Sequence, residues 1–330
     1  MIRRALWIAC LGLLLALPAR ADEAVRLGVI VYDGTDTFIS SMRTEFEEYA
    51  APLAELIIHD SHNDQNQQIQ QVDQLIAQNV DAIILNPVDR TAAGYLIEIA
   101  RAADVPIVFY NREPLLEDMQ LYDKAYYVGA RATESGQLSG EIMADYFLAH
   151  PEADKNGDGI VQYVLLRGEP GHQDAELRSQ YAIKPLQDAG FQLEKLQEDT
   201  GNWQRALAQD KMAGFLAAYG DAIECVFANN DDMALGAIDA LKAAGYFTEG
   251  RYMPVVGMDA TAPALEALRS GSLLGTVYND GVNQARACVD LAMLLANGLP
   301  VDEGSLSYPL ENGKYIWIPY QRVTLEGVDP

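Results

Sequence analysis

Five short polar side chains occupy equivalent places in the sequence, each just after a short apolar run. They are Asp36, Asn111, Asn230, Asp259 and Asn279. Asp accepts hydrogen bonds on a short, stiff side chain and Asn both accepts and donates them, so a cluster of them can bind a ligand with several hydroxyl groups. Each residue alone could equally belong to a turn or cap a helix. Their recurrence favours a site for a polyhydroxylated ligand.

A further polar segment, 168–178, follows the apolar run that ends at Leu166. It places His172, Asp174 and Arg178 near the start of a predicted helix. Asp174 and Arg178 are four residues apart, a spacing that brings both side chains to one helix face and allows an ion pair. Alone, the pattern fits either a capped helix with a surface salt bridge or a group of donors and acceptors for ligand hydroxyls.

An acidic loop has oxygen-bearing residues at the spacing typical of a Ca²⁺-binding site. Its candidate ligands, at positions 1, 3, 5, 7 and 9 of an EF-hand-like pattern, are Asp154, Asn156, Asp158, Ile160 and Gln162. Position 6 is glycine, as the sharp turn requires, and position 7 needs to supply only its backbone carbonyl. Position 12 is leucine instead of the usual bidentate glutamate. The loop alone could therefore also be an acidic surface turn.

The elements that would position these residues alternate between short apolar strands and amphipathic helices. The predicted strands are 27–31, 56–59, 82–86, 106–111, 126–129, 161–166, 192–197, 223–229, 254–258, 274–279 and, in the tail, 315–320. The predicted helices are 38–51, 65–78, 91–103, 134–149, 174–189, 204–219, 232–244, 262–270 and 282–297.

This alternation predicts an α/β fold with two doubly wound parallel-sheet lobes, each sheet covered by helices on both faces. A chain of 330 residues is also long for one hydrophobic core and suits two. In open parallel sheets, ligands bind beyond the carboxyl ends of the strands. The five Asn and Asp residues follow such ends.

The N-terminus has the pattern of a secretory signal peptide. Two arginines precede an apolar run at 5–17, and 19–21 is Ala-Arg-Ala, a small-residue cleavage site. The run is shorter than the roughly 20 apolar residues of a membrane span. Cys10 lies inside the run, whereas a lipid-attachment cysteine would end it. We therefore expect removal of 1–21, a mature protein that begins at Asp22, and export to the periplasm.

Charge and cysteine content narrow the range of partners. The formal net charge is −25 at pH 7, which repels nucleic acid and anionic membranes, so we expect neither as a partner. The mature chain keeps Cys225 and Cys288, both in apolar stretches. Export would permit a disulfide, but the two residues fall in different predicted lobes, so we expect buried free thiols.

Several stretches of the sequence resemble the periplasmic galactose/glucose-binding proteins of the type I periplasmic-binding superfamily. They are 168–178 (GEPGHQDAELR), 122–129 (YDKAYYVG), 229–231 (NND, followed after one residue by Met-Ala) and 275–280 (GTVYND). The similarity extends from Leu27 to about Tyr320.

The resemblance implies a type I periplasmic-binding fold, in which the two lobes are joined by three crossovers and close over the ligand by hinge bending. The implied crossovers are near 130–133, 277–280 and 311–315. The implied N-terminal lobe is 22–131 plus 278–312, and the implied C-terminal lobe is 132–277 plus 313–330.

The resemblance also assigns sugar-contacting roles to ten positions, all of which hold the family's residue type. They are Asp36, Phe38, Asn111, His172, Asp174, Arg178, Trp203, Asn230, Asp259 and Asn279. Phe38 and Trp203 would cover the two faces of a pyranose ring, and the polar groups would bond its hydroxyls. The family uses the carboxylate at position 36 for the 4-hydroxyl. A carboxylate can accept from either epimer, so the resemblance implies that D-galactose and D-glucose both bind.

The same family supplies the carboxylate missing from the acidic loop from a distant strand, and Glu224 stands at the matching place. The resemblance therefore implies a structural Ca²⁺ held by Asp154, Asn156, Asp158, Ile160, Gln162 and Glu224. It also implies that an inner-membrane sugar ABC transporter recognises the closed protein, with a chemoreceptor as a further candidate partner. We expect the chain to work as a monomer and to catalyse no reaction.

Three alternatives remain. A glycosidase would use paired carboxyl groups such as those of Asp36, Asp174 and Asp259, but we expect Arg178 and the Asn residues to keep these carboxylates ionised as acceptors. A transcriptional regulator of the same fold would need a DNA-binding domain where the predicted signal peptide lies. A binding protein for ribose, xylose or autoinducer-2 would share the fold without a reason for all ten matching positions.

Overall fold

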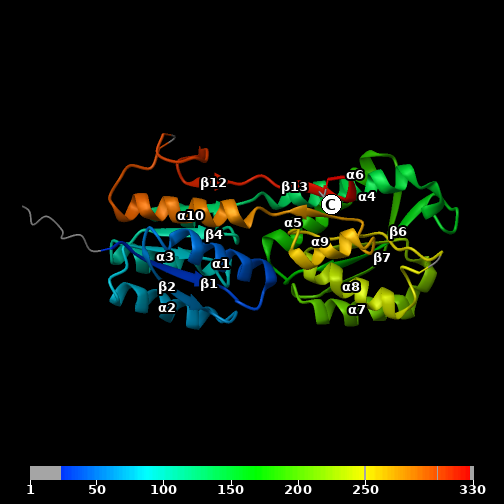
Figure 1. The fold of residues 1–330 in the computed structure, drawn as a ribbon, viewed down its shortest axis with the longest axis horizontal. Coiled ribbons are helices and arrows are strands. Elements are labelled where there is room, and N and C mark those ends of the chain that lie inside the picture. Colours follow the sequence, from blue (N-terminus) through cyan, green and yellow to red (C-terminus); the bar gives the residue numbers. More distant parts are fainter. Residues whose placement is uncertain (1–23, 249, 303, 328–330) are drawn as a thin grey trace, which may run out of the picture.

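The computed structural model describes residues 24–248, 250–302 and 304–327. These residues form two α/β lobes that lie side by side along the long axis of the molecule (Figure 1). The α/β prediction is confirmed, because each lobe is a mostly parallel sheet with helices against it. The predicted signal peptide, 1–21, lies outside the described residues.

The first lobe is built on a sheet with the strand order β11-β12-β5-β4-β3-β1-β2. Its strands are β1 (Arg26–Val31), β2 (Glu55–Asp60), β3 (Ala82–Leu85), β4 (Ile107–Tyr110), β5 (Ala125–Gly129), β11 (Leu310–Glu311) and β12 (Tyr315–Trp317). All neighbouring pairs are parallel except β11 with β12. Its helices are α1 (Thr37–Ala50), α2 (Gln65–Ala77), α3 (Ala93–Ala102) and α10 (Gly281–Ala296).

The buried strand β1 shows how the first lobe covers both faces of its sheet. Successive side chains point to opposite faces, so Val29 belongs to the apolar cluster under α1 and α10, and Ile30 to the cluster under α2 and α3. Gly28 permits α2 to approach closely, because a Cβ at this position would lie 2.5 Å from Cδ1 of Leu75. Continuous apolar runs therefore mark these strands, as expected of a sheet buried on both faces.

The second lobe has the strand order β13-β10-β9-β8-β6-β7. Its strands are β6 (Ile160–Arg167), β7 (Gln192–Thr200), β8 (Cys225–Ala228), β9 (Val255–Val256), β10 (Gly275–Tyr278) and β13 (Gln321–Thr324). Its helices are α4 (Ala132–Ala149), α5 (Gln173–Ala182), α6 (Lys184–Asp188), α7 (Arg205–Tyr219), α8 (Asp231–Ala243) and α9 (Ala262–Arg269). Only β13 runs antiparallel to its neighbour, β10.

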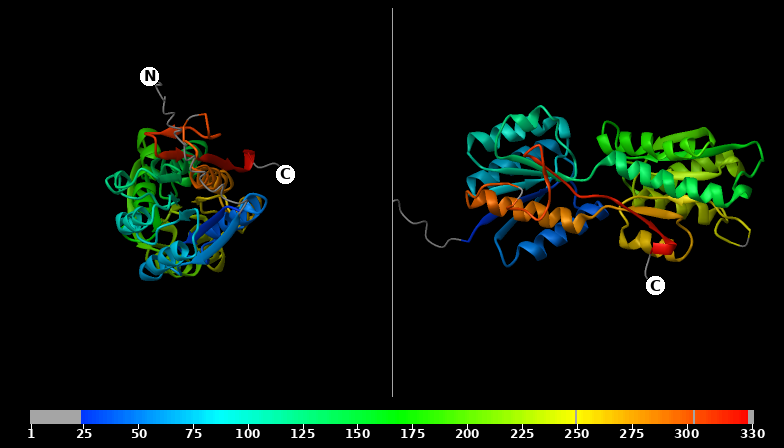
Figure 2. Two further views of the ribbon diagram at one scale, coloured as in Figure 1. Left: turned by 90° about the vertical axis from the view of Figure 1, so that its left-hand side faces the viewer. Right: turned by 90° about the horizontal axis from the view of Figure 1, so that it is seen from above.

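The chain passes between the lobes after β5, after β10 and after β12. Helix α10 follows β10 but packs on β3, β4 and β5 of the first lobe. Figure 2 shows the connecting segments close together between the lobes, where the segment before α10 and the segment between β12 and β13 cross. Connections that lie close together suit a hinge, because the lobes can move apart around them.

Two predictions about elements were wrong, and a proline lies at each error. The predicted strand 315–320 ends early: only Tyr315–Trp317 forms a strand, β12, which pairs with β5. The next strand, β13, begins at Gln321 in the second lobe and pairs with β10. The third crossover therefore lies at 318–320 instead of 311–315, and 313–317 belongs to the first lobe. Pro319 lies within this crossover, where no ladder hydrogen bond is needed.

The predicted helix 174–189 is likewise divided, into α5 and α6. Pro185 occupies the first turn of α6, because it lacks the N–H that a continuous helix would require there.

The prediction of buried free thiols is confirmed for both cysteines of the described chain. Cys225 lies in β8 and Cys288 in α10, so they are in separate lobes, and both are free and fully buried. Burial raises the pKa of both thiols, which keeps them protonated and unreactive. Within the described part of the chain, no helix combines the length and apolar character needed to cross a membrane.

Candidate ligand-binding cleft

A cavity between the lobes is lined by nine of the ten predicted sugar-contacting residues. The first lobe contributes Asp36, Phe38 and Asn111, and the second contributes His172, Asp174, Arg178, Trp203, Asn230 and Asp259. The tenth, Asn279, is set behind the wall, where its Nδ2 donates to Oδ1 of Asp259 at 3.2 Å. The volume is only about 30 Å³, well below the roughly 300 Å³ of a small ligand pocket. A ligand therefore needs the lobes or side chains to move apart before it enters.

On the first lobe, Asp36 both caps α1 and lines the cavity. Its Oδ1 accepts from the backbone N–H of Ile39 at 3.0 Å, and its Oδ2 accepts from the hydroxyl of Tyr32 at 2.7 Å. Asn111 follows β4 with a φ of 59°, and its Oδ1 accepts from Nδ2 of Asn86 at 3.2 Å. Both side chains are held in place by neighbours, so the site is rigid on this side.

On the second lobe, Arg178 is the centre of the polar network. It is 4% exposed, and its Nη1 donates to the backbone oxygen of Asn229 at 2.9 Å. Its Nη2 donates to Oδ2 of Asp174 at 3.1 Å and to the hydroxyl of Tyr320 at 3.0 Å. The predicted ion pair is confirmed, but it is buried beside the cavity and not at the surface. The nearby Nε of Arg178 is buried without a hydrogen-bond partner among the described residues.

His172 and Trp203 form an aromatic corner of the cavity. Nδ1 of His172 accepts from the backbone N–H of Asp174 at 3.1 Å, which leaves Nε2 to carry the proton of the neutral ring. Burial, and then the positive charge of Arg112, lowers the pKa of His172 well below its usual value. The rings of His172 and Trp203 meet edge to face, 4.9 Å apart. The site thus offers a neutral N–H donor next to an aromatic wall.

The remaining wall and its support come from loops that follow β8, β9 and β10. Asn230 caps α8, with its Oδ1 accepting from the N–H of Met233 at 2.9 Å, and its Nδ2 donates to the backbone oxygen of Trp203 at 3.1 Å. Asp259 adopts a φ of 109°, in a backbone region that side chains rarely enter. Nδ2 of Asn279 donates to the carboxylate of Asp259, and Oδ1 of Asn279 accepts from Nε2 of Gln284 in α10. These three loops converge because parallel strands end at the same edge.

The pKa shifts of the carboxyl groups run against the expected effect of Arg178. Burial raises the pKa of Asp36 and Asp174 and raises that of Asp259 well above the usual value. Arg178 lowers the pKa of Asp174 and Asp259, but burial is the larger effect. The expectation took the positive charge of Arg178 into account but not the desolvation of the carboxyl groups by burial. Hydroxyl groups that donate to these carboxylates would favour the ionised form again.

Sequence reasoning missed three residues that line the cavity: Tyr32, Ile39 and Arg112. The guanidinium carbon of Arg112 lies 3.8 Å above the centre of the Tyr32 ring. Its Nη2 lies 2.9 Å from Oε2 of Glu169, which belongs to the second lobe. Asn63 of the first lobe donates to Oε1 of the same Glu169 at 3.2 Å. Arg112 follows Asn111 directly, but no local signal reveals a partner in the other lobe.

Further contacts between side chains join the rims of the lobes. Oγ1 of Thr37, the first residue of α1, donates to Oδ2 of Asp232 in α8 at 2.7 Å. Nε2 of Gln173 donates to Oε2 of Glu113 at 3.0 Å. The arrangement is therefore a closed clamp, held by polar contacts around the cavity.

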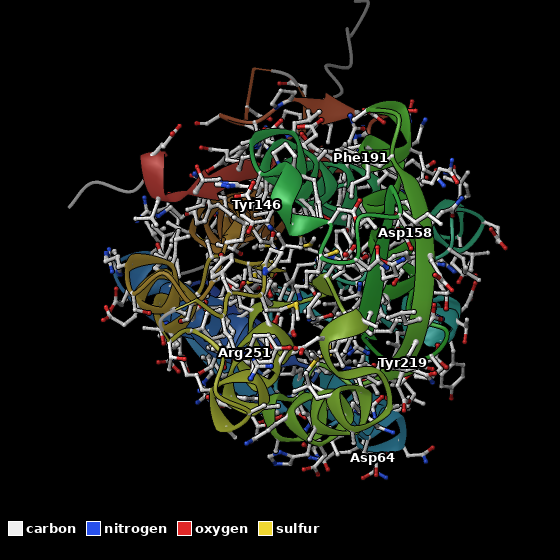
Figure 3. All side chains as sticks on the ribbon, turned by 90° about the vertical axis from the view of Figure 1, so that its right-hand side faces the viewer. Asp64, Tyr146, Asp158, Phe191, Tyr219 and Arg251 are labelled. Carbon is white, nitrogen blue, oxygen red and sulfur yellow. The ribbon has the colours of Figure 1, made fainter. Side chains whose placement is uncertain are left out.

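The acidic loop lies between α4 and β6, away from the cleft, and Asp158 is seen in the view from the end of the second lobe (Figure 3). Both carboxylate oxygens of Asp154 accept backbone N–H groups, those of Gly157 and Gly159, each at 2.8 Å. Oδ1 of Asp158 accepts from the N–H of Ile160 at 2.8 Å. The loop is thereby folded with its side-chain oxygens turned inward.

Glu224 reaches this loop from the residue before β8, as the resemblance implied. Its Oε1 accepts from the N–H of Lys155 at 2.6 Å, and its Oε2 accepts from that of Gln162 at 3.1 Å. Oε1 of Gln162 is buried without a partner among the described residues. No group of three or more His, Cys, Asp or Glu side chains placed to hold a metal occurs in the described ranges, but half of this predicted set are amide and carbonyl oxygens. Oxygen donors and an orphaned buried oxygen fit a hard cation.

Two doubly wound lobes that enclose a polar and aromatic cavity define a ligand-binding clamp with a type I periplasmic-binding fold. The chain belongs to the periplasmic binding protein family, since the model of the periplasmic binding protein domain matches residues 27–300.

Comparison with individual proteins agrees with this assignment. The chain is 41% identical over 298 residues to the D-galactose/methyl-galactoside binding periplasmic protein MglB of Haemophilus influenzae, covering 89% of this chain and 88% of that protein. It is 32% identical to a xylitol-binding protein of Mycolicibacterium smegmatis, covering 85% of this chain and 74% of that one. A solute-binding protein of a Bacillus halodurans ABC transporter, solved with bound myo-inositol, is 33% identical, with a TM-score of 0.76 over 92% of this chain and 95% of that one.

Proposed function

We propose that this protein captures D-galactose or D-glucose in the cavity between its lobes and delivers the sugar to an inner-membrane ABC transporter. The observation that carries the proposal is the convergence of nine predicted sugar-contacting residues on one cavity. Phe38 comes from the first lobe and Trp203 from the second, so closure brings an aromatic ring from each lobe to the ligand. The similarity to a D-galactose/methyl-galactoside binding protein supports the hexose over other polyols.

The chemistry of the walls suits capture without reaction. Asp36, Asp174 and Asp259 each accept hydrogen bonds from protein groups, so their oxygens are oriented before the ligand arrives. A hydroxyl that donates to a carboxylate forms a bond roughly twice as strong as a neutral one. We infer that these carboxyl groups serve as acceptors and that the protein is not an enzyme. Release of monosaccharide from aryl-galactosides or aryl-glucosides by the purified protein would contradict this.

Isothermal titration of the mature, sugar-free protein tests the ligand. We expect one-to-one binding of D-galactose and D-glucose and no heat with D-ribose. The panel should include myo-inositol and xylitol, because similar proteins bind them. If either polyol bound and neither hexose did, the hexose assignment would be wrong while the clamp would stand.

A structural Ca²⁺ is a second part of the proposal. Asp154, Asn156, Asp158, Ile160, Gln162 and Glu224 would supply its oxygens. The folded loop and the unpartnered Oε1 of Gln162 support this assignment. Such an ion would tie the loop before β6 to the start of β8, and it would take no part in sugar binding. Metal analysis of the dialysed protein, with Glu224→Gln as the control, tests it.

We infer the remaining properties from the same family membership. The N-terminal pattern supports export, and N-terminal sequencing of the secreted protein should begin at Asp22. We also propose that the chain functions as a monomer. The closed clamp would be the form that the transporter recognises, and a chemoreceptor could read the same closed form.

A further inference from the structure

A second, larger cavity adjoins the proposed sugar cavity at the mouth of the cleft. It is lined by residues 88–91, Arg112 and Glu113 of the first lobe and by residues 169–174 of the second, and its volume is about 330 Å³. We call it the outer cavity. Arg112, His172 and Asp174 line both cavities, so the two adjoin each other. Of these two cavities, the outer one reaches the size of a small ligand pocket and the inner one does not.

The charges of the outer cavity select the kind of group that it can hold. Carboxyl groups outnumber guanidinium groups on its walls: Asp89, Glu113, Glu169 and Asp174 against Arg90 and Arg112. Arg90 already donates to the backbone oxygens of Glu113 and Pro114. A phosphate or carboxylate would therefore be repelled here, and the formal net charge of −25 adds to that repulsion. A neutral group meets no such penalty.

Two residues that line the outer cavity, Arg112 and Gln173, carry unpaired polar atoms. Nε of Arg112 and Oε1 of Gln173 are buried without a hydrogen-bond partner among the described residues. Arg112 is only 5% exposed and belongs to the first lobe, whereas Gln173 belongs to the second. A buried polar atom without a partner costs free energy, so a hydroxylated group that pairs with both would bind favourably. Pairing with both would also connect the lobes.

We propose that the outer cavity is a second subsite and that the chain binds neutral disaccharides. The terminal hexose occupies the inner cavity, and a second hydroxylated unit, such as another hexose, occupies the outer one. This proposal rests on the proposed hexose function and extends it from monosaccharides to disaccharides. The free hexose fills only the inner part of the available space.

The test is isothermal titration with D-galactose, D-glucose and neutral disaccharides whose terminal hexose is linked through position 1, 4 or 6. We expect at least one disaccharide to bind one-to-one with a Kd within about tenfold of the free hexose. If a hexose binds and every disaccharide fails, the second subsite is refuted while the proposed function stands. If neither hexose nor disaccharide binds, both are refuted.

A variant that fills only the outer cavity sharpens the test. Thr91 lines the outer cavity, is exposed, and is absent from the inner wall. Thr91→Trp should leave the Kd of the free hexose within about twofold and raise that of the disaccharide by at least about tenfold. Thr44→Trp, at an exposed position on α1, is the matched control and should change neither Kd. An equal effect of Thr91→Trp on hexose and disaccharide, or no effect on the disaccharide, would overturn the subsite.

Discussion

Replacing Glu169 with Gln should make the closed clamp open faster while each lobe keeps its structure. Glu169 of the second lobe is held by Arg112 and Asn63 of the first, at 2.9 Å and 3.2 Å. The change keeps the size of the side chain and one amide oxygen for Asn63, but it removes the charge that faces Arg112. Since this contact exists only between the lobes, its loss acts on closure.

The size of the effect follows from burial. A hydrogen bond to a charged group contributes roughly 1.5–3 kcal/mol. The Arg112 side chain is 5% exposed, but that of Glu169 is 21% exposed and partly screened by water, so the lower end applies. A loss of about 1.5 kcal/mol from the closed state is about tenfold in the closing equilibrium. The Kd of the hexose should rise by about tenfold, chiefly through faster dissociation.

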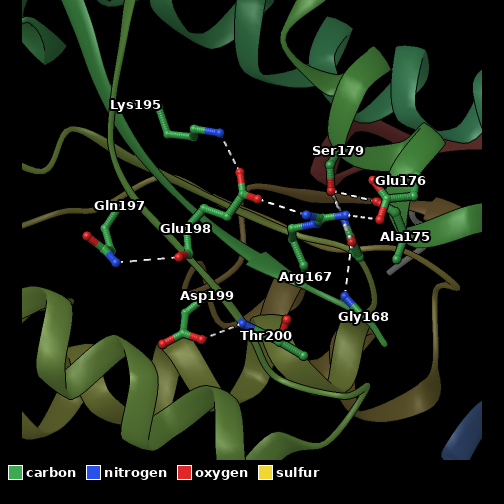
Figure 4. A network of polar contacts seen from close by, with 11 residues as sticks. Arg167, Gly168, Ala175, Glu176, Ser179, Lys195, Gln197, Glu198, Asp199 and Thr200 are labelled. Atoms are coloured by element: carbon green, nitrogen blue, oxygen red, sulfur yellow. Dashed lines mark hydrogen bonds and ion pairs between the residues drawn. The ribbon is translucent and has the colours of Figure 1, made fainter. Parts of the chain in front are cut away.

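Stopped-flow tryptophan fluorescence can measure that dissociation, because Trp203 lines the inner cavity. The matched control is Glu198→Gln. Glu198 accepts from Arg167 at 2.9 Å and its side chain is 27% exposed, but both partners belong to the second lobe (Figure 4). We expect Glu198→Gln to leave the dissociation rate unchanged. If Glu169→Gln also leaves it unchanged, or if both variants raise it equally, contacts other than this ion pair hold the clamp closed.

Three further predictions concern the wall, the interior and the loop. Gly168→Ala should raise the hexose Kd by on the order of tenfold, measured by calorimetry, because its Cβ would lie 2.1 Å from Cη2 of Trp203 and displace the indole. Burial raises the pKa of Asp231 to about 7, above its unfolded value, so the folded state holds an extra proton. The free energy of unfolding should therefore fall as the pH rises from about 4 to about 7, and Asp231→Asn should flatten that slope by up to about 1.4 kcal/mol per pH unit in denaturant titrations. Chelation of Ca²⁺ should lower the Tm by roughly 5 °C, and Glu224→Gln should remove that difference in calorimetric scans.

The sequence predicted most strands and helices because their signals are local. Gly28 to Val31 is apolar on both faces of a strand, and such runs recur before each polar strand end. The errors arose where one residue outweighed the pattern around it. Pro185 divides a predicted helix, and Pro319 lies just beyond the early end of a predicted strand, although the apolar spacing continues past each of them.

The site was predictable to the extent that it lies at strand ends. Residues that follow parallel strands lie along one edge of the sheet, so their grouping can be predicted without knowing how the lobes are arranged. This is why Asn111, Asn230 and Asp259 converge as expected. Arg112 was missed because its role depends on Glu169, which lies 57 positions further along the chain and in the other lobe. The pKa of Asp259 was misjudged for a related reason, since burial is a property of the closed clamp and not of a motif.

The competing interpretations of the strand-end residues as helix caps or as ligand contacts prove compatible, because the hydrogen-bonding capacity of these side chains is not exhausted by capping. Asn230 uses Oδ1 for the N–H of Met233 and one Nδ2 hydrogen for Trp203, which leaves its second Nδ2 hydrogen for a ligand. Asp36 accepts one bond on each carboxylate oxygen, and each oxygen has a second lone pair. Capping also fixes the side-chain torsions before the sugar arrives, so binding loses little rotamer entropy. A residue that caps a helix at a strand end is therefore better suited to hold a hydroxyl than a free surface side chain of the same type.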